Sequence, residues 1–208
     1  MHPPRRRLEP VTLDNLGDLL QPCRACVSWE LGAVAAERAA QAGDRALEKE
    51  AWVSAVLLEW GRCGVLAYVD DVPAGYIVYA PPALVPRAAT FPTSPVSADA
   101  ALLVTAFVRP DRQGAGLGRS LVHAAAKDLL RRGFRAVEAF GDARWERPGC
   151  VVPADYLKVV GFETVRPHHR WPRLRLDLRS TLDWRADVEV AVERILGSVV
   201  PEPSLRPV

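Results

Sequence analysis

The residues best suited to chemistry lie at positions 113–120, where the chain reads QGAGLGRS. Gly114, Gly116 and Gly118 alternate with other residues, so the backbone can turn tightly and come close to a bound group. An apolar run precedes this segment and an alanine-rich amphipathic pattern follows it, which predicts a strand, a loop and a helix. The N–H groups and the positive dipole end at the start of that helix favour an anion. We therefore expect a polyphosphorylated molecule to bind here.

Two common phosphate-binding loops fit this segment poorly. A Walker loop ends in Gly-Lys-Ser/Thr, whereas Gly118 is followed by Arg119 and Ser120, and too few residues separate the outer glycines. A dinucleotide fingerprint needs a third glycine three positions after the second, where Arg119 stands. The loop also lies in mid-chain rather than after the first strand. Neither a Walker nor a dinucleotide-binding loop is favoured.

The elements that must position the loop alternate between helix and strand patterns, which is typical of an α/β protein. Alanine and leucine dominate residues 29–60, and Gly43-Asp44 predicts a break between two helices there. The second helix has apolar residues on two faces, so we expect it to be buried on both sides or to pack against a partner as well. These faces hold Leu47, Ala51, Ala55 and Leu58 on one side and Trp52, Val56 and Trp60 on the other.

Strand patterns occupy the middle of the chain. Residues 64–69 and 75–80 read as a hairpin, and the apolar run 100–108 reads as a central strand covered on both faces. The helix that follows is expected to end at Gly133, and a strand restarts at Phe134. A proline-rich passage, residues 81–99, joins the hairpin to the central strand. It is either a loop beside the substrate or a plain connector.

Composition narrows the class of protein. The chain has 208 residues, of which 49% are apolar and 25% charged, enough for one core domain. A net charge of +2 is too small to indicate nucleic-acid or membrane partners, so we expect neither, and the basic run Arg5–Arg7 is expected to be a solvated terminus. We find no signal-peptide pattern and no uncharged stretch long enough to span a membrane. We expect a cytoplasmic protein.

The cysteines do not form a recognisable metal motif. Cys23 and Cys26 are one close pair, Cys63 and Cys150 stand apart, and no second pair completes a zinc-ribbon spacing. The histidines at positions 168–169 could join a site, but their place between a proline and a tryptophan suits a turn. We expect reduced thiols and no bound metal.

The glycine segment resembles the signature of the Gcn5-related N-acetyltransferases (GNAT), which is Arg or Gln, two residues, Gly, one residue, then Gly or Ala. Gln113, Gly116 and Gly118 match it, and Val108 and Pro110 stand where family members usually have valine and proline. Downstream, the sequence YLKVVGFE resembles the second family motif, a short helix that ends in Gly-Phe before the next strand. The resemblance covers about residues 5–178.

The resemblance implies an α/β (α+β) fold with a mixed, largely antiparallel sheet flanked by helices, in which two strands splay apart. The cofactor would be acetyl-CoA, whose pantetheine arm lies between the splayed strands like an added strand. The implied cofactor contacts are the backbone of Ala106, Phe107 and Val108 for the pantetheine, Gln113, Gly114, Ala115, Gly116, Leu117 and Gly118 for the pyrophosphate, and further contacts from Arg119 and Ser120.

The end of the chain is not covered by the resemblance. We expect an acetyltransferase-like domain over residues 1–179 and a separate tail over 180–208. Residues 181–197 have an apolar stripe at helical spacing, which predicts a helix. That stripe would pack on the domain or form the contact of a homodimer.

Acetyl transfer requires a deprotonated amine, a polarised thioester carbonyl and a stabilised leaving thiolate. The family often uses a glutamate or water for the first task and a tyrosine for the last, but Leu157 stands at the usual tyrosine position and Tyr156 one residue earlier. Tyr156 is therefore the candidate acid, or a packing or coenzyme contact. Glu138 is the first candidate base, because burial among aromatic residues would raise its pKa; otherwise it pairs with an arginine. Thr105 and Asp99 are second choices.

The sequence thus predicts an N-acetyltransferase that moves an acetyl group from acetyl-CoA to a primary amine, on a small molecule or a peptide. A non-catalytic acyl-CoA-binding or sensing domain is the alternative from another class. A third hypothesis is a purely structural glycine turn in a protein whose apolar helices bind a partner. No motif in the chain identifies the acceptor.

Overall fold

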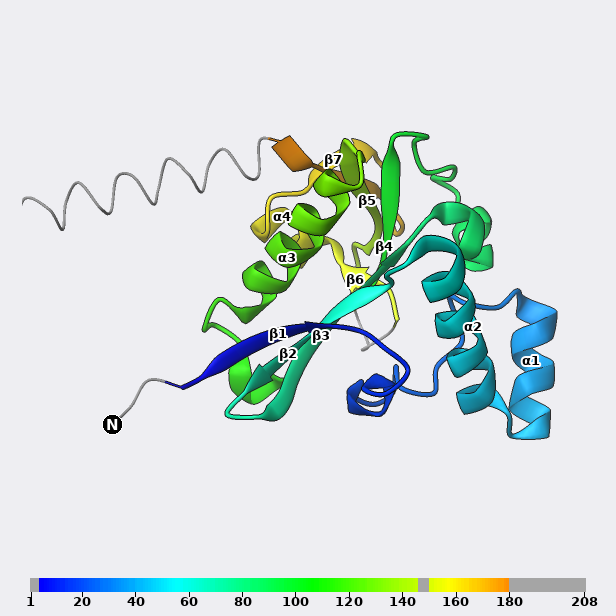
Figure 1. Ribbon diagram of the computed structural model, residues 1–208. Coiled ribbons are helices and arrows are strands. Elements are labelled where there is room, and N and C mark those ends of the chain that lie inside the picture. The colour runs from blue at the N-terminus through cyan, green and yellow to red at the C-terminus, as the bar shows by residue number, and fades with distance from the viewer. Residues whose placement is uncertain (1–3, 146–149, 180–208) are drawn as a thin grey trace, which may run out of the picture.

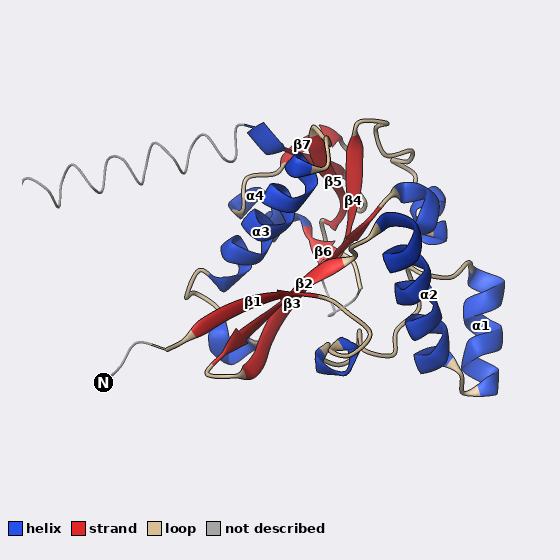
Figure 2. Ribbon diagram, in the orientation of Figure 1, coloured by secondary structure: helices blue, strands red, loops and turns tan. Residues whose placement is uncertain are grey.

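The computed structural model describes residues 4–145 and 150–179, and within them one mixed sheet forms the centre of the molecule (Figures 1 and 2). Its strand order is β1-β2-β3-β4-β5-β8-β7, with β6 paired to β5. Neighbouring strands are antiparallel except for β4–β5 and β5–β6. The α+β class and the mixed, largely antiparallel sheet are confirmed. The strands are β1 (Arg6–Pro10), β2 (Gly64–Val69), β3 (Val72–Ala80), β4 (Ala100–Val108), β5 (Ala136–Asp142), β6 (Val152–Pro153), β7 (Glu163–Arg166) and β8 (Arg173–Asp177).

Helices cover the two faces of the sheet and create two apolar cores (Figure 1). On one face lie α3 (Leu117–Arg131) and α4 (Ala154–Val159). On the other lies α2 (Arg45–Trp60), together with the N-terminal segment and the proline-rich passage, and α1 (Ala33–Ala42) packs against α2. Short 3-10 helices complete the described part: η1 (Leu16–Asp18), η2 (Pro82–Leu84), η3 (Pro86–Thr90) and η4 (Pro110–Arg112).

The hairpin β2–β3 is tighter than the sequence suggested. Asp70 and Asp71 have φ values of 51° and 62°, so these two residues make the whole turn in the left-handed region. As a result β3 begins at Val72, three residues before the expected start at Gly75. The basic run before the hairpin is also more ordered than expected, because Arg6 and Arg7 belong to β1 and pair with β2.

Helix α2 is buried on one face only, which corrects the expectation of two. Trp52, Val53 and Val56 are buried, whereas Leu47 is 65% and Leu58 is 84% exposed. The face with Trp52 is the one that packs on the sheet, because it buries more apolar area and because Trp52 Nε1 donates a 2.7 Å hydrogen bond to the carbonyl of Leu84. The two predicted helices and their break at Gly43 are confirmed.

Strands β4 and β5 separate soon after they begin. They pair in parallel only over Ala100–Leu102 and Ala136–Glu138. Beyond that point β4 stays with β3 as far as Val108, while β5 stays with β8 as far as Phe140. In the described structure, the second half of β4 therefore has no strand partner on the side that faces β5. This is the splay that the family resemblance implies.

The predicted C-terminal helix and tail, residues 180–208, lie outside the described residues. Among the described helices, none is long and apolar enough to cross a membrane.

Candidate functional site

The glycine loop connects the splayed end of β4 to the start of α3. After Val108, the short helix η4 reverses the chain, and Gln113 Nε2 donates a 3.1 Å hydrogen bond back to the carbonyl of Val108. Gly114 and Gly116 both have φ of +78°, and a Cβ at either position would meet nothing within 4 Å. These two glycines are therefore required by backbone conformation, and the space around them is open.

Gly118 is favoured for a different reason. Its backbone is helical, but an added Cβ would lie 2.6 Å from the hydroxyl oxygen of Tyr156. The side chain of Tyr156, which comes from α4, thus packs directly on the first turn of α3. The two sequence motifs that carry the family resemblance are in contact through this pair of residues.

The first turn of α3 faces the open space with its N–H groups. The first hydrogen bonds of the helix run to the carbonyl of Gly116 from the backbone N–H of Ser120 at 3.0 Å and from its hydroxyl at 3.2 Å. The N–H groups of Leu117 and Gly118, which precede Ser120 in the same first turn, have no carbonyl of the helix to bind and can donate to an external acceptor. Leu117 is 3% exposed and anchors this end of the helix in the core. The arrangement suits an anionic group.

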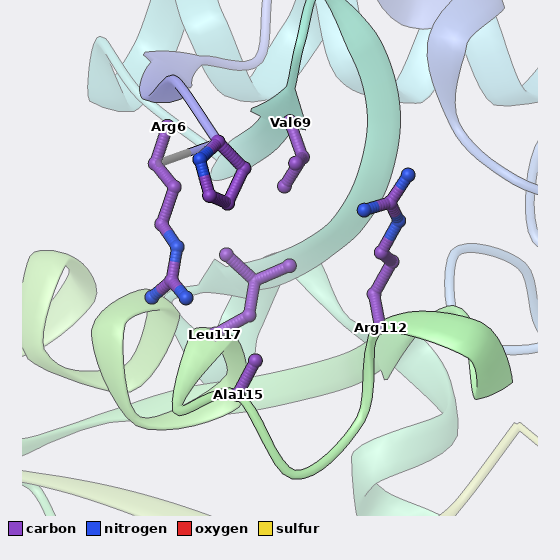
Figure 3. Close-up of a pocket in the computed structure, with 6 residues that line it drawn as sticks. Arg6, Val69, Arg112, Ala115 and Leu117 are labelled. Atoms are coloured by element: carbon purple, nitrogen blue, oxygen red, sulfur yellow. The ribbon is translucent and has the colours of Figure 1, made fainter. Parts of the chain in front are cut away.

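Two arginines stand beside the loop. A small cavity of about 50 Å³ is lined by Arg6 and Arg112, with Val69, Ala115 and Leu117 between them (Figure 3). The cavity itself is too small for a cofactor. Arg6 adds positive charge near the helix start, whereas the Arg112 guanidinium lies 3.5 Å from the carboxylate of Asp111. Arg112 lies in the turn before the loop, whereas Arg6 comes from β1. No sequence motif points to Arg6, because only the pairing of β1 with β2 brings it here.

The other predicted cofactor residues lie at the end of β4, past its pairing with β5. Ala106, Phe107 and Val108 are all half-buried. Ala106 and Val108 pack toward α3, and Phe107 packs on the opposite face against Tyr76, with ring centroids 5.8 Å apart. The structure therefore places the predicted pantetheine strand and the predicted pyrophosphate loop in one continuous path.

Tyr156 and Leu157 have different surroundings. Leu157 stands at the usual family tyrosine position and is fully buried in the core under α3. Tyr156 is half-buried, and burial raises its pKa to about 12. The phenol therefore keeps its proton at neutral pH and can donate a hydrogen bond near Gly118. Its role in proton transfer stays a prediction.

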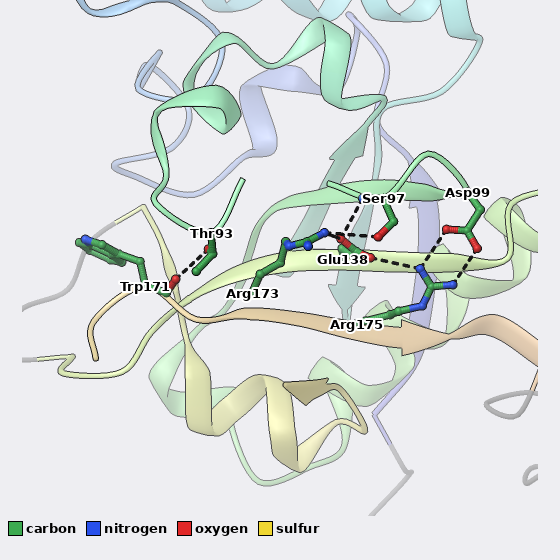
Figure 4. A network of polar contacts seen from close by, with 7 residues as sticks. All are labelled: Thr93, Ser97, Asp99, Glu138, Trp171, Arg173 and Arg175. Carbon is green, nitrogen blue, oxygen red and sulfur yellow. Dashed lines mark hydrogen bonds and ion pairs between the residues drawn. The ribbon is translucent and has the colours of Figure 1, made fainter. Parts of the chain in front are cut away.

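Glu138 is buried as expected, but its environment differs from the prediction (Figure 4). Its carboxylate pairs with Arg173 and, at 3.1 Å, with Arg175, and it accepts a 3.1 Å hydrogen bond from the backbone N–H of Ser97. Burial would raise the pKa of Glu138, but the hydrogen bonds from Ser97 and the two arginines outweigh it and lower the pKa. The expected raised pKa is wrong, and the alternative of an arginine pair is what the structure contains.

The second-choice bases are also placed by the structure. Hydrogen bonds from the Arg175 guanidinium lower the pKa of Asp99, with the two groups joined at 3.0 and 2.8 Å. Thr105 is buried in β4. Both arginines of this network come from β8, far along the chain from Asp99 and Glu138, so these four charged residues form no recognisable sequence motif.

The face of the splay opposite α3 is lined with stacked aromatic rings. Phe91 stacks on Phe140 with centroids 4.3 Å apart, and Trp29 stacks on Phe91 at 5.2 Å. Trp171 meets Phe91 edge-on, and the Thr93 hydroxyl donates a 2.8 Å hydrogen bond to its carbonyl (Figure 4). The proline-rich passage therefore lies over the sheet beside the splay. This position agrees with both hypotheses for that passage, a loop beside the substrate and a plain connector over the sheet.

Three cysteines gather behind these rings. The Sγ atoms of Cys26 and Cys150 are 3.2 Å apart, and Cys23 lies next to them. Within the described residues, no group of three or more histidine, cysteine, aspartate or glutamate side chains has a geometry that would hold a metal ion. His168 accepts hydrogen bonds at Nδ1 from the backbone of Arg170 and Trp171, which is the predicted turn.

A protein-family model described as the acetyltransferase (GNAT) family matches residues 27–162. The chain belongs to this GNAT family. The matched segment ends at the pair Gly161-Phe162. It therefore contains the glycine motif and the helix and Gly-Phe pair of the second motif. A comparison with curated proteins finds no match.

Solved GNAT structures share the fold at low sequence identity. PaiA N-acetyltransferase from Thermoplasma acidophilum, solved with coenzyme A, is 13% identical with a TM-score of 0.55, over 83% of this chain and 99% of that one. An N-acetyltransferase from Staphylococcus aureus Mu50 is 14% identical with a TM-score of 0.53, over 84% and 99%. YncA from Salmonella typhimurium, solved with acetyl-CoA, is 15% identical with a TM-score of 0.52, over 83% and 94%.

Proposed function

We propose that this protein is an N-acetyltransferase that uses acetyl-CoA and acts on a primary amine. The observation that carries the proposal is the unpaired second half of β4, which leads directly into a glycine loop at the start of α3. The PaiA and YncA structures hold coenzyme A and acetyl-CoA, respectively, in the same fold. Family membership and local geometry therefore support the same cofactor.

The strand, the loop and the helix start offer a suitable group to each part of the coenzyme. The edge of β4 over Ala106–Val108 offers backbone groups to the amide-rich pantetheine arm, much as a neighbouring strand would. The glycine loop and the first turn of α3 offer N–H groups to the pyrophosphate. We infer that Arg6 and Arg112 attract the phosphates, and that Tyr156 contacts the coenzyme where it crosses Gly118.

We infer that Glu138 is a positioning residue and not the general base. Its carboxylate is already engaged by one backbone N–H and two guanidinium groups, so it is poorly placed to accept a proton from an ammonium. The network instead ties β5 to β8 and to the proline-rich passage at Ser97. The amine proton would then leave through water at the rim of the splay.

Calorimetric titration with acetyl-CoA tests the cofactor, with two matched variants. Gly116→Glu places a carboxylate at the proposed pyrophosphate site. Gly133→Glu is its control, because Gly133 ends the same helix with φ of +85° and equally open surroundings. The backbone strain is therefore similar in both variants, and only the first should lose micromolar binding. Failure of the parent chain to bind would overturn the proposal, and equal losses in both variants would overturn the assignment of the loop.

Turnover separates transfer from sensing. With candidate amines present, an acetyltransferase releases free coenzyme A thiol, whereas an acyl-CoA sensor binds acetyl-CoA and leaves it intact. In the same assay Tyr156→Phe should raise the coenzyme KM several-fold with little change in kcat if Tyr156 is a coenzyme contact. A large fall in kcat at unchanged KM would instead assign it the role of proton donor.

A further inference from the structure

Three thiols meet on the α1–α2 side of the sheet, and no step of the proposed transfer uses them. Cys23 and Cys26 come from the N-terminal segment, and Cys150 precedes β6. The Sγ atoms of Cys26 and Cys150 are 3.2 Å apart, and the hydroxyl of Ser28 lies 2.9 Å from the first of these. Cys26 and Cys150 are both partly exposed, so a small reagent can reach them.

The backbone holds both sides of this contact. Trp29 Nε1 donates a 2.9 Å hydrogen bond to the carbonyl of Cys150, which ties that segment to the N-terminal loop. Lys49 Nζ donates a 3.3 Å hydrogen bond to the carbonyl of Cys26 and is itself paired with the buried carboxylate of Glu30. The two sulfur atoms are therefore brought together by interactions that do not involve sulfur.

The three thiols differ in acidity. Hydrogen bonding from the Cys150 thiol lowers the pKa of Cys23 to about 7, with smaller contributions from Tyr76 and Lys49. The hydrogen bond with Cys23 raises the pKa of Cys150, and the hydrogen bond with Cys150 raises that of Cys26. The 3.2 Å contact between the Sγ atoms of Cys26 and Cys150, and not the acidity of the buried Cys23, determines which two thiols can be linked.

We propose that Cys26 and Cys150 form an oxidation site for hydroperoxides, and that the stable product is a disulfide between them. The sulfur of one of these two partly exposed residues attacks a peroxide oxygen and gives up its proton, the O–O bond breaks, and water or an alcohol leaves, so that this residue becomes a sulfenic acid. The sulfur of the other residue then displaces water from the sulfenic acid and forms the disulfide. In total, two thiols lose two electrons and two protons, and the peroxide gains them.

The contact between Cys26 and Cys150 means that the final bond needs little backbone movement. The site does not depend on acetyl transfer, so its test has a readout separate from activity.

The test treats the full-length reduced protein with hydrogen peroxide, alkylates the remaining thiols in denaturant and maps peptides by mass spectrometry. The chain has four cysteines, and we expect free thiols to fall from four to two, with one Cys26–Cys150 link that dithiothreitol reverses. Cys63, fully buried, should remain alkylatable after unfolding. Four free thiols at peroxide levels that oxidise exposed thiols, or links only between chains, would overturn the proposal.

Matched variants test which thiols form the link. Cys26→Ser and Cys150→Ser should each abolish the reversible link within the chain, because each removes one of the two sulfur atoms in contact. Cys63→Ser and Cys23→Ser, two buried controls, should still form it. A link of the same size that persists in Cys26→Ser or Cys150→Ser would overturn the proposal. The peptide map of the parent protein tests the link itself even if a variant folds poorly.

Discussion

Replacing Glu138 by glutamine tests whether this carboxylate holds the structure or takes a proton. The side chain is fully buried and contacts Ser97, Arg173 and Arg175 (Figure 4). Glutamine has nearly the same shape but no charge, so it leaves two guanidinium groups without their shared counter-ion. We therefore expect a loss of stability with little change in kcat for the folded protein.

The size of this loss of stability depends on how far the charges of Arg173 and Arg175 are still neutralised in Glu138→Gln. Removing one partner of a buried ion pair costs about 3 to 5 kcal/mol. The side chains of Arg173 and Arg175 are 12% and 23% exposed, and Arg175 keeps its bond to Asp99. Water and Asp99 thus offset part of the cost, and we expect about 2 to 3 kcal/mol. For a chain of this length that corresponds to a fall in Tm of about 4 to 12 °C.

Urea denaturation at several pH values is the assay. Because the pKa of Glu138 is lowered in the folded state, its contribution is present above its ordinary pKa of 4.5 and is lost as the pH falls through the folded-state pKa. The stabilities of parent and Glu138→Gln should therefore differ at pH 7 and converge in acid. Glu59→Gln, an exposed control on α2, should follow the parent throughout. Unchanged stability with a hundredfold fall in kcat would refute this reasoning and make Glu138 the base.

Three further changes follow from particular contacts. Gly118→Ala should destabilise the protein by about 1 to 3 kcal/mol, because its Cβ overlaps the Tyr156 hydroxyl; adding Tyr156→Phe should recover part of the loss in a denaturation double-mutant cycle. Lys49→Met leaves the buried carboxylate of Glu30 without its cation and should cost about 3 to 5 kcal/mol in urea denaturation, less when Glu30→Gln is added. The rate of Cys23 alkylation by iodoacetamide, followed by peptide mass, should rise with pH and reach half its maximum near pH 7. A midpoint above pH 8.5 would contradict that assignment.

Much of the framework around the loop could be predicted because its signals are local. Strand β4 has its predicted bounds and helix α3 ends at Arg131, two residues before the predicted Gly133, since an apolar run, a proline and a four-residue apolar repeat follow one another within residues 100–131. The α2 helix was also found, but the choice of its buried face was not. Helical periodicity reports that a face is apolar, whereas the sheet and the carbonyl of Leu84 decide which face is covered.

The same limit explains the errors in the candidate site. Strand alternation correctly placed Glu138 on an inner face, but its neighbours in the sequence are apolar and its real partners come from β8, which pairs with β5 in an antiparallel register. The pKa of a buried carboxylate depends on those partners more than on burial itself. A glutamate among hydrophobic residues therefore predicts a base only when no strand across the sheet carries an arginine at the matching position. Here Arg175 stands opposite Glu138 in the register, and Arg173 lies two residues away. An alternating Arg-x-Arg strand late in the chain is thus the sequence signal that could have assigned this carboxylate to an ion pair.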